Sequence, residues 1–122
     1  QGLLLEKKIR NLTRDSGFQA GDMVEVTLEF HVSTQLSHVA VNDPIPAGSN
    51  ILSEAYGGFS WGEKSYAGYK LYFEVLPAGV NVVQYQYQLN NPGSFKLPPT
   101  HAEALYMPGI YADTPNAAMR ID

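Results

Sequence analysis

The sequence predicts an all-β fold, an antiparallel β-sandwich that forms one domain over residues 1–122. Several segments alternate strictly between apolar and polar side chains, a pattern that places the apolar ones on one face of a half-buried strand. Short turn segments rich in Gly, Pro, Asn and Asp separate the alternating segments, as in known β-sandwiches. No segment has the length and periodicity of a convincing long helix. A chain of 122 residues is also long enough to bury a core of its own.

The first third of the chain is expected to form an edge strand and then a core strand. Residues 3–10 begin with leucines and end with charged side chains, and lysines on an edge strand discourage pairing with another molecule. Residues 23–34 alternate more clearly than any other segment. The expected core side chains there are Val24, Val26, Leu28, Phe30 and Val32. Residues 38–41 follow, and the prolines within residues 42–48 are expected to stop any ladder, because proline cannot donate to it.

The middle of the chain is expected to contain strands separated by a long loop. Residues 51–56 are the next strand candidate, and residues 56–67 are interpreted as a glycine-rich loop that carries large aromatic side chains. Alternation resumes over residues 69–76 and is strict over residues 83–89. In the last of these strands the expected core side chains are Val83, Tyr85, Tyr87 and Leu89.

The last third of the chain begins with turn chemistry. Residues 90–93 supply the backbone freedom for a reversal, so a hairpin or a strand crossing is expected there. Residues 100–107 allow two interpretations. A strand near a sheet edge is favoured, and a short helical turn is the alternative, because Thr100 and Glu103 fit a capping box. Residues 117–121 are expected to form a last short strand.

Composition excludes several classes of function. The formal net charge is −4 and the chain has no run of Lys or Arg, so binding to nucleic acid, which needs clustered positive charge, is not expected. The absence of cysteine excludes disulfides, thiolate metal ligands and a cysteine nucleophile. No stretch is apolar enough to span a membrane. The chain begins with Gln1 and shows no signal-peptide pattern, so we expect a processed or excised piece of a longer protein.

No set of side chains predicts catalysis, so the chain is not expected to be an enzyme or to bind a cofactor. His31 and His38 lie on or beside segments predicted as adjacent strands, but no carboxylate lies at metal-ligand spacing from them. Ser60 or Ser65 could form a catalytic triad with His101 and Asp113, but neither serine lies in a nucleophile elbow, so a triad is not expected. Exposed polar positions are therefore the favoured interpretation of the histidines.

Two proline-containing segments carry further information. Residues 41–48, VNDPIPAG, fit the pattern V-x-D-P-L-P-A-G. Residues 91–99 and 102–108 fit the patterns PG-x-F-x-x-PP and AE-x-MY-x-P, in register with the first segment and preceded by a tyrosine-rich strand. Both patterns are similar to the last macroglobulin-like domain of bacterial α2-macroglobulins. Together with residues 2–10 and 21–29, the resemblance covers nearly the whole chain.

The resemblance implies an immunoglobulin-like macroglobulin domain, the MG10 or receptor-binding-like domain, excised from the C-terminal end of a much larger chain. It implies a non-catalytic part of an endopeptidase inhibitor for host defence. In such inhibitors a protease cuts a bait region, and a thioester then captures the protease covalently. This domain would pack beside the thioester domain and shield it until that cleavage. The implied partners are other parent domains, target proteases and a penicillin-binding protein. The implied location is the periplasm, with anchoring to the inner membrane through the parent chain.

Motif position gives two residues that would shield the thioester or contact other domains, Tyr106 and Met107, and Tyr111 lies nearby as a third candidate. An aromatic cap limits access of water, and a phenol can hydrogen-bond an acyl group. A half-buried strand position is the alternative for Tyr106. Leu105 stands where the family has Met, and one bacterial lineage lacks the thioester. Trp61 is a further contact candidate, although such residues more often close a core edge. A structural β-sandwich module of a bacterial surface or adhesin protein is the alternative function.

Overall fold

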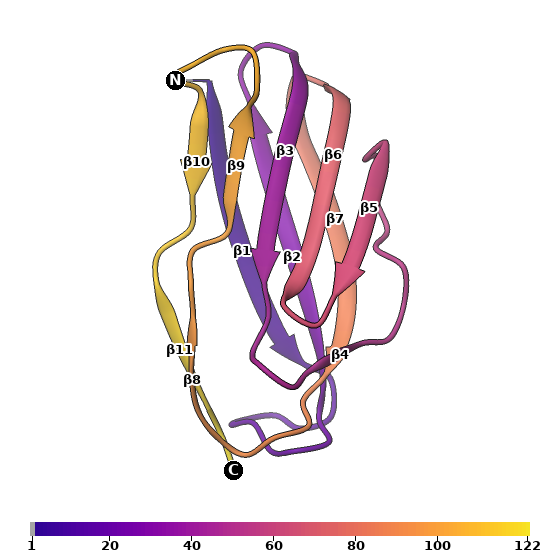
Figure 1. The fold of residues 1–122 in the computed structure, drawn as a ribbon, viewed down its shortest axis with the longest axis vertical. Helices are drawn as coiled ribbons and strands as arrows, with labels where there is room; N and C mark the ends of the chain where they lie inside the picture. Colours follow the sequence, from indigo (N-terminus) through magenta and orange to yellow (C-terminus); the bar gives the residue numbers. More distant parts are fainter. Residues whose placement is uncertain (1) are drawn as a thin grey trace.

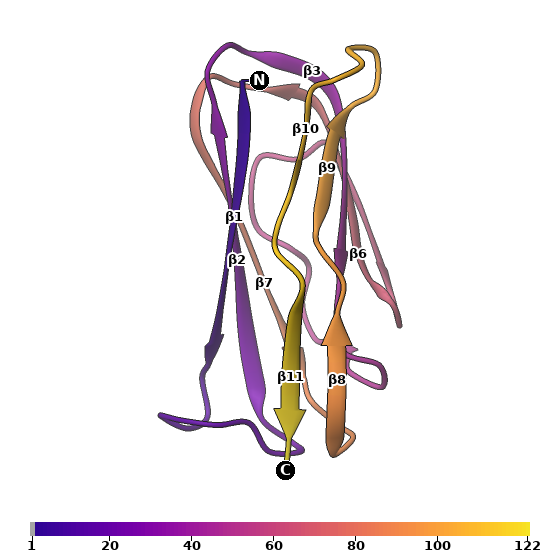
Figure 2. The ribbon, with the colours of Figure 1, turned by 90° about the vertical axis from the view of Figure 1, so that its left-hand side faces the viewer.

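A computed structural model describes residues 2–122 and confirms the antiparallel β-sandwich. Its four-stranded sheet has the order β1 (Leu3–Asn11), β2 (Met23–Val32), β7 (Gly79–Gln88) and β4 (Asn50–Ile51). Its five-stranded sheet has the order β10 (Tyr111–Asp113), β9 (His101–Ala104), β3 (Leu36–Pro44), β6 (Gly68–Leu76) and β5 (Trp61–Ser65). A two-stranded ladder pairs β11 (Ala117–Ile121) with β8 (Gly93–Leu97). Figures 1 and 2 show the sheets as facing layers, with this ladder at the end near the C-terminus.

The core lies between the two sheets and follows from the alternation in the sequence. Along β2 every second side chain is buried, and in β7 the same alternation starts at Val83. The expected core side chains of both segments are all buried: Val24, Val26, Leu28, Phe30, Val32, Val83, Tyr85, Tyr87 and Leu89. Across the sandwich, Phe30 meets Phe73 of β6 edge to face, with ring centroids 5.4 Å apart. The two most regular segments of the sequence therefore supply one wall of the core.

Two predictions for the middle of the chain need correction. The strand predicted over residues 51–56 is wrong, because β4 ends at Ile51 and only an isolated bridge joins Tyr56 to Gln84. The loop predicted over residues 56–67 is wrong in part, because it contains β5, which pairs with β6. Every residue of β5 is exposed, so this edge strand leaves no alternating pattern in the sequence.

The predicted chain reversals are confirmed in part. The prolines stop the ladder as expected, since β3 ends at Pro44, opposite Gly68, although Asn42 and Asp43 still pair with β6. The reversal at residues 90–93 is a crossing, because β8 pairs with β11 and not with β7. Residues 100–107 contain the favoured strand, β9, and residues 117–121 form β11 as predicted. Nowhere in residues 2–122 is there a helix with the length and hydropathy to span a membrane.

A buried carboxylate joins the two sheets. Asp43 is fully buried near the end of β3, and Lys7 from β1 places its Nζ 2.6 Å from Oδ1. Thr100 donates its hydroxyl to the same oxygen at 2.5 Å, and Tyr85 from β7 donates to Oδ2. Burial, aided by the nearby Asp43 charge, raises the pKa of the Tyr85 phenol well above its usual range. Asp43 belongs to the proline-containing segment at residues 41–48, so that segment encodes a polar anchor between the sheets.

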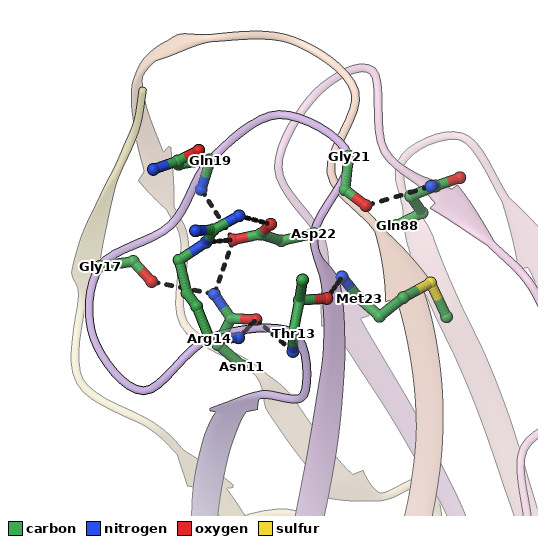
Figure 3. Close-up of polar contacts among 9 residues, drawn as sticks. All are labelled: Asn11, Thr13, Arg14, Gly17, Gln19, Gly21, Asp22, Met23 and Gln88. Carbon is green, nitrogen blue, oxygen red and sulfur yellow. Dashed lines mark hydrogen bonds and ion pairs between the residues drawn. The ribbon is translucent and has the colours of Figure 1, made fainter.

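A second buried carboxylate holds the loop between β1 and β2, as Figure 3 shows. Asp22 accepts two hydrogen bonds from Arg14, at 2.6 Å from Nε and 2.8 Å from Nη2. Asn11 and the backbone amide of Gln19 also donate to this carboxylate. The Leu89 amide donates to the Asp22 carbonyl and the Gly21 amide donates to the Leu89 carbonyl, so the loop is connected to the residue that follows β7. The hydrogen bond from the Arg14 guanidinium is the main reason why the pKa of Asp22 lies well below its usual range.

The lowered pKa of Asp22 makes stability depend on pH in the acid range. Its contribution is complete above the unfolded pKa, about 4, and is lost as the pH falls from there toward the folded pKa. We expect Asp22→Asn to be less stable than the unsubstituted chain at neutral pH and to lose less further stability below about pH 4. Urea unfolding of both chains from neutral pH down to about pH 2 measures this. Identical acid profiles would contradict the role of Asp22.

Candidate interdomain contact site

The site residues that the sequence singles out lie on the hairpin of β9 and β10, at one end of the five-stranded sheet (Figures 1 and 2). β9 pairs with β3 on one side and with β10 on the other. Residues 105–110 form the loop that connects β9 to β10. Within the loop, the Met107 amide donates to the Ala104 carbonyl at 3.2 Å and the Ile110 amide donates to the Met107 carbonyl at 3.1 Å. Gly109 has a φ of +91°, a conformation that favours glycine. The loop is therefore a hydrogen-bonded turn.

This loop and the start of β10 carry an exposed apolar cluster, Leu105, Tyr106, Met107 and Tyr111, which we call the contact patch. Tyr106 is 75% exposed and Met107 is 47% exposed. The half-buried strand position considered for Tyr106 is wrong, because this residue lies in the turn after β9. Clustered apolar side chains on a surface commonly mark a site of contact with another protein surface. The structure thus places the two residues given by motif position and the nearby Tyr111 on one hairpin.

His38 of β3 supports the contact patch from the neighbouring strand. Its ring meets Tyr106 edge to face, with ring centroids 5.0 Å apart, and its Nδ1 is hydrogen-bonded to the Tyr72 hydroxyl of β6. Its carbonyl accepts a hydrogen bond from the Leu105 amide at 2.9 Å. The His38 backbone has a φ of +57°, which is unusual for a residue other than glycine. One residue of β3 thus contacts the loop through both its ring and its backbone.

A second histidine lies on the hairpin itself. His101 places Nδ1 2.7 Å from Asp113 and Nε2 2.8 Å from Glu103. The hydrogen bond with Asp113 is the main cause of a raised pKa for His101. The serines considered with it, Ser60 and Ser65, form their hydrogen bonds with β6 and the turn before it. Over residues 2–122, therefore, the hydrogen bonds do not join a serine to His101.

Carboxylates meet His31 on the outer face of the four-stranded sheet, which corrects a prediction. His31 Nε2 lies 2.9 Å from Glu6 and 3.5 Å from Glu29, close enough for the three side chains to hold a metal ion. Sequence spacing did not show this, because β-pairing places Glu6 directly opposite Glu29. His31 and His38 do not lie on adjacent strands, since β2 and β3 belong to different sheets. Lys8 also contacts Glu29, at 3.3 Å, so the cluster forms a network of polar contacts on the surface.

Trp61 does not close an edge of the core. It is 52% exposed at the start of β5, where it lies opposite Tyr72. A groove runs from these two rings across Ala40 and Asn42 of β3 to His101 and Glu103 of β9. Trp61 thus lies on the outer face of the sheet that carries the hairpin.

Comparison with protein-family models matches residues 2–109 to the bacterial alpha-2-macroglobulin MG10 domain. The match includes both proline-containing segments and most of the contact patch. The chain belongs to this family. Membership in this family favours an alpha-2-macroglobulin domain over the surface-module alternative. Comparison with curated protein sequences gives no significant match to this chain.

Solved alpha-2-macroglobulins contain the same fold as this MG10 domain. A Salmonella alpha-2-macroglobulin mutant, in which one tyrosine is replaced by glycine, matches 99% of this domain at 17% identity with a TM-score of 0.87. The match covers 9% of the Salmonella chain. Salmonella alpha-2-macroglobulin reacted with methylamine matches 99% at 18% identity, with a TM-score of 0.85, over 9% of that chain. Native Escherichia coli alpha-2-macroglobulin from domain MG7 to the C-terminus matches 99% at 17% identity, with a TM-score of 0.83, over 23% of that chain. The MG10 domain is thus a small part of the chains that it resembles.

Sequence reasoning about this MG10 domain missed the contact between His38 and the patch. A weak signal exists in the spacing of apolar residues, because Leu36 and Val39 are both buried although they are three apart. On β6, Phe73 and Leu76 show the same interval, and Val75, which strict alternation over residues 69–76 would place on the buried face, is exposed. The change of phase on both strands marks an irregular position. It does not reveal that β9 lies beside it.

Proposed function

We propose that this MG10 domain packs against neighbouring domains of its parent chain, and that the contact patch shields a thioester in one of them until a protease cuts the bait region. One observation carries the proposal: Tyr106 and Met107, at their motif positions, lie exposed on a hydrogen-bonded turn. Contact with a second protein surface would remove this apolar area from water, which is favourable. A fixed turn also reduces the conformational entropy lost on contact.

The chemistry of the patch suits protection of a reactive acyl group. Hydrolysis or aminolysis of a thioester requires that water or an amine reaches its carbonyl carbon, and close-packed apolar side chains prevent this. The Tyr106 hydroxyl can donate a hydrogen bond to an acyl oxygen. Because the domain has no cysteine, the thioester would belong to another domain. The role of the MG10 domain would therefore be protective and conformational, and not catalytic.

Two of the similar structures support the choice of a test. One Salmonella alpha-2-macroglobulin was reacted with methylamine, and another carries glycine in place of a tyrosine. A small amine and a tyrosine variant are thus suitable probes for the parent of this domain. We further propose that the parent is an endopeptidase inhibitor of the periplasm, anchored to the inner membrane. Target proteases and a penicillin-binding protein would be its partners there.

Amine incorporation into the full-length parent protein tests the shielding role. We expect Tyr106→Ala and Met107→Ala to incorporate labelled methylamine several-fold faster than the wild type before any protease is added, because the cap is opened. Tyr106→Phe separates the hydroxyl from the ring. Tyr66→Ala is the matched control, because Tyr66 is 87% exposed but lies in the turn before β6, away from the patch.

Two results would count against the proposal. Wild-type rates in both alanine variants would mean that the patch does not shield the thioester. No incorporation into any form of the parent, even after protease cleavage, would mean that the parent has no thioester. The contact patch would then serve only interdomain packing.

A further inference from the structure

We propose that His38 is a positioning residue that holds Tyr106 in its exposed orientation, so that the patch is shaped before it meets another domain. This inference rests on the proposed function for the consequence of that orientation, but the contact itself lies within the domain. His38 and Tyr106 come from different elements, β3 and the loop after β9, which are neighbours only because β9 pairs with β3.

The His38 backbone is the first observation that carries the inference. Among residues 2–122, His38 is the one residue other than glycine for which the structure gives a positive φ, at +57°. Such a conformation is strained for a side chain with a Cβ, and strained residues that persist commonly lie at functional sites. The phase changes in β3 and β6 occur at this position, between Leu36 and Val39 and between Phe73 and Leu76. The strain thus coincides with an irregularity shared by two paired strands.

The second observation is that the irregularity directs His38 toward the loop. The His38 carbonyl accepts the Leu105 amide hydrogen at 2.9 Å, which fixes the residue directly before Tyr106. The imidazole lies at 79° to the Tyr106 ring, with centroids 5.0 Å apart, an arrangement that is favourable for two aromatic rings. The Tyr72 hydroxyl is hydrogen-bonded to Nδ1 of the same imidazole. A chain of contacts therefore runs from the rigid sheet through Tyr72 and His38 to Tyr106.

The third observation is the exposure of Tyr106, because a ring that is 75% exposed has few other contacts to order it. A free ring would sample several rotamers and lose that freedom on docking. The edge-to-face contact with His38 restricts the ring in advance. His38 itself is only half buried, so its replacement does not open the core.

The test uses His38→Asn, because asparagine tolerates a positive φ and keeps the backbone carbonyl while the ring is removed. The matched control is His31→Asn, since His31 is a half-buried histidine on the other sheet. In the full-length parent we expect His38→Asn to increase methylamine incorporation before protease by about two- to tenfold, the range that corresponds to losing one aromatic pair. Tyr72→Phe should act in the same direction with a smaller increase.

The rate of amine incorporation into a double variant, His38→Asn with Tyr106→Ala, distinguishes action through Tyr106 from a general structural role of His38. If His38 acts through Tyr106, His38→Asn with Tyr106→Ala should react no faster than Tyr106→Ala alone. Additive increases, or a wild-type rate for His38→Asn while Tyr106→Ala is fast, would overturn the inference.

NMR separates failure of this inference from failure of the proposed function. In the 122-residue chain, we expect His38→Asn to shift the ring resonances of Tyr106 and lower the order parameters of its side chain, while His31→Asn leaves both unchanged. This result is expected even if Tyr106→Ala does not alter amine incorporation, which would refute the shielding role alone. An unchanged Tyr106 ring in His38→Asn would refute the positioning role.

Discussion

Replacement of Lys7 by Met is expected to lower the free energy of unfolding by about 3 to 5 kcal/mol, because it leaves the Asp43 carboxylate buried without its cation. The Lys7 side chain is 10% exposed and the Asp43 side chain is 0% exposed, so water cannot replace the lost partner at low cost. Tyr85 and Thr100 still donate to the carboxylate, but neither neutralises its charge. Urea unfolding of the 122-residue chain gives the difference in free energy.

The neighbouring lysine provides the control for this substitution. Lys8 points out of the sheet with its side chain 69% exposed, and its contact with Glu29 at 3.3 Å is an exposed salt bridge. Such pairs contribute less than about 1 kcal/mol, so Lys8→Met should change the free energy of unfolding by no more than that. If Lys7→Met lowered the free energy of unfolding no more than Lys8→Met, the contact of Lys7 with Asp43 between the sheets would be unimportant for stability.

Replacement of Gly68 by Ala is the second change with a large expected effect. Gly68 starts β6 with a φ of +147°, and an added Cβ would lie 2.1 Å from the carbonyl oxygen of Asp43. Since that oxygen belongs to the backbone of a buried residue, β3 or β6 must move. Backbone strain and overpacking together predict a loss of about 2 to 5 kcal/mol in the free energy of unfolding.

Gly79→Ala separates these two contributions. Gly79 also has a positive φ, +103°, but no heavy atom lies within 4 Å of its added Cβ. This variant carries backbone strain alone, so Gly68→Ala should lose more than Gly79→Ala by about 1 to 3 kcal/mol. Both are measured by urea unfolding, in parallel with the lysine variants. An equal loss in both glycine variants would contradict the predicted clash with Asp43.

The sequence predicts the parts of this fold in which each strand faces the core on one side only. β2 and β7 are such strands, and their alternation identifies eight buried side chains correctly, together with Leu89 directly after β7. β5 could not be found in this way, because its five residues are all exposed and its strand conformation depends on pairing with β6. The crossing after residue 89 was also undetermined, since turn residues allow a reversal without choosing the partner strand.

The candidate site was predictable in part for a similar reason. Motif position gives Tyr106 and Met107, and the structure places them with the nearby Tyr111 on one exposed hairpin. The supporting residues His38 and Tyr72 lie far from them in the sequence and meet them only through the order of strands in the five-stranded sheet. A single sequence does not state that order. Long-range pairing therefore hides the support of the patch, while local motifs reveal the patch itself.

Photocrosslinking from position 106 in the full-length parent tests the central claim, that the contact patch meets another domain, most directly. Benzoylphenylalanine replaces Tyr106 in one form of the protein and Tyr66 in a control form. Both tyrosines are exposed, but Tyr66 lies in the turn before Gly68, which pairs with the last residue of β3, whereas Tyr106 contacts His38 near the start of β3. We expect irradiation before protease cleavage to join position 106 to a peptide from a neighbouring domain, at a yield well above that of position 66. Equal yields at the two positions, or no crosslink from position 106, would contradict the account.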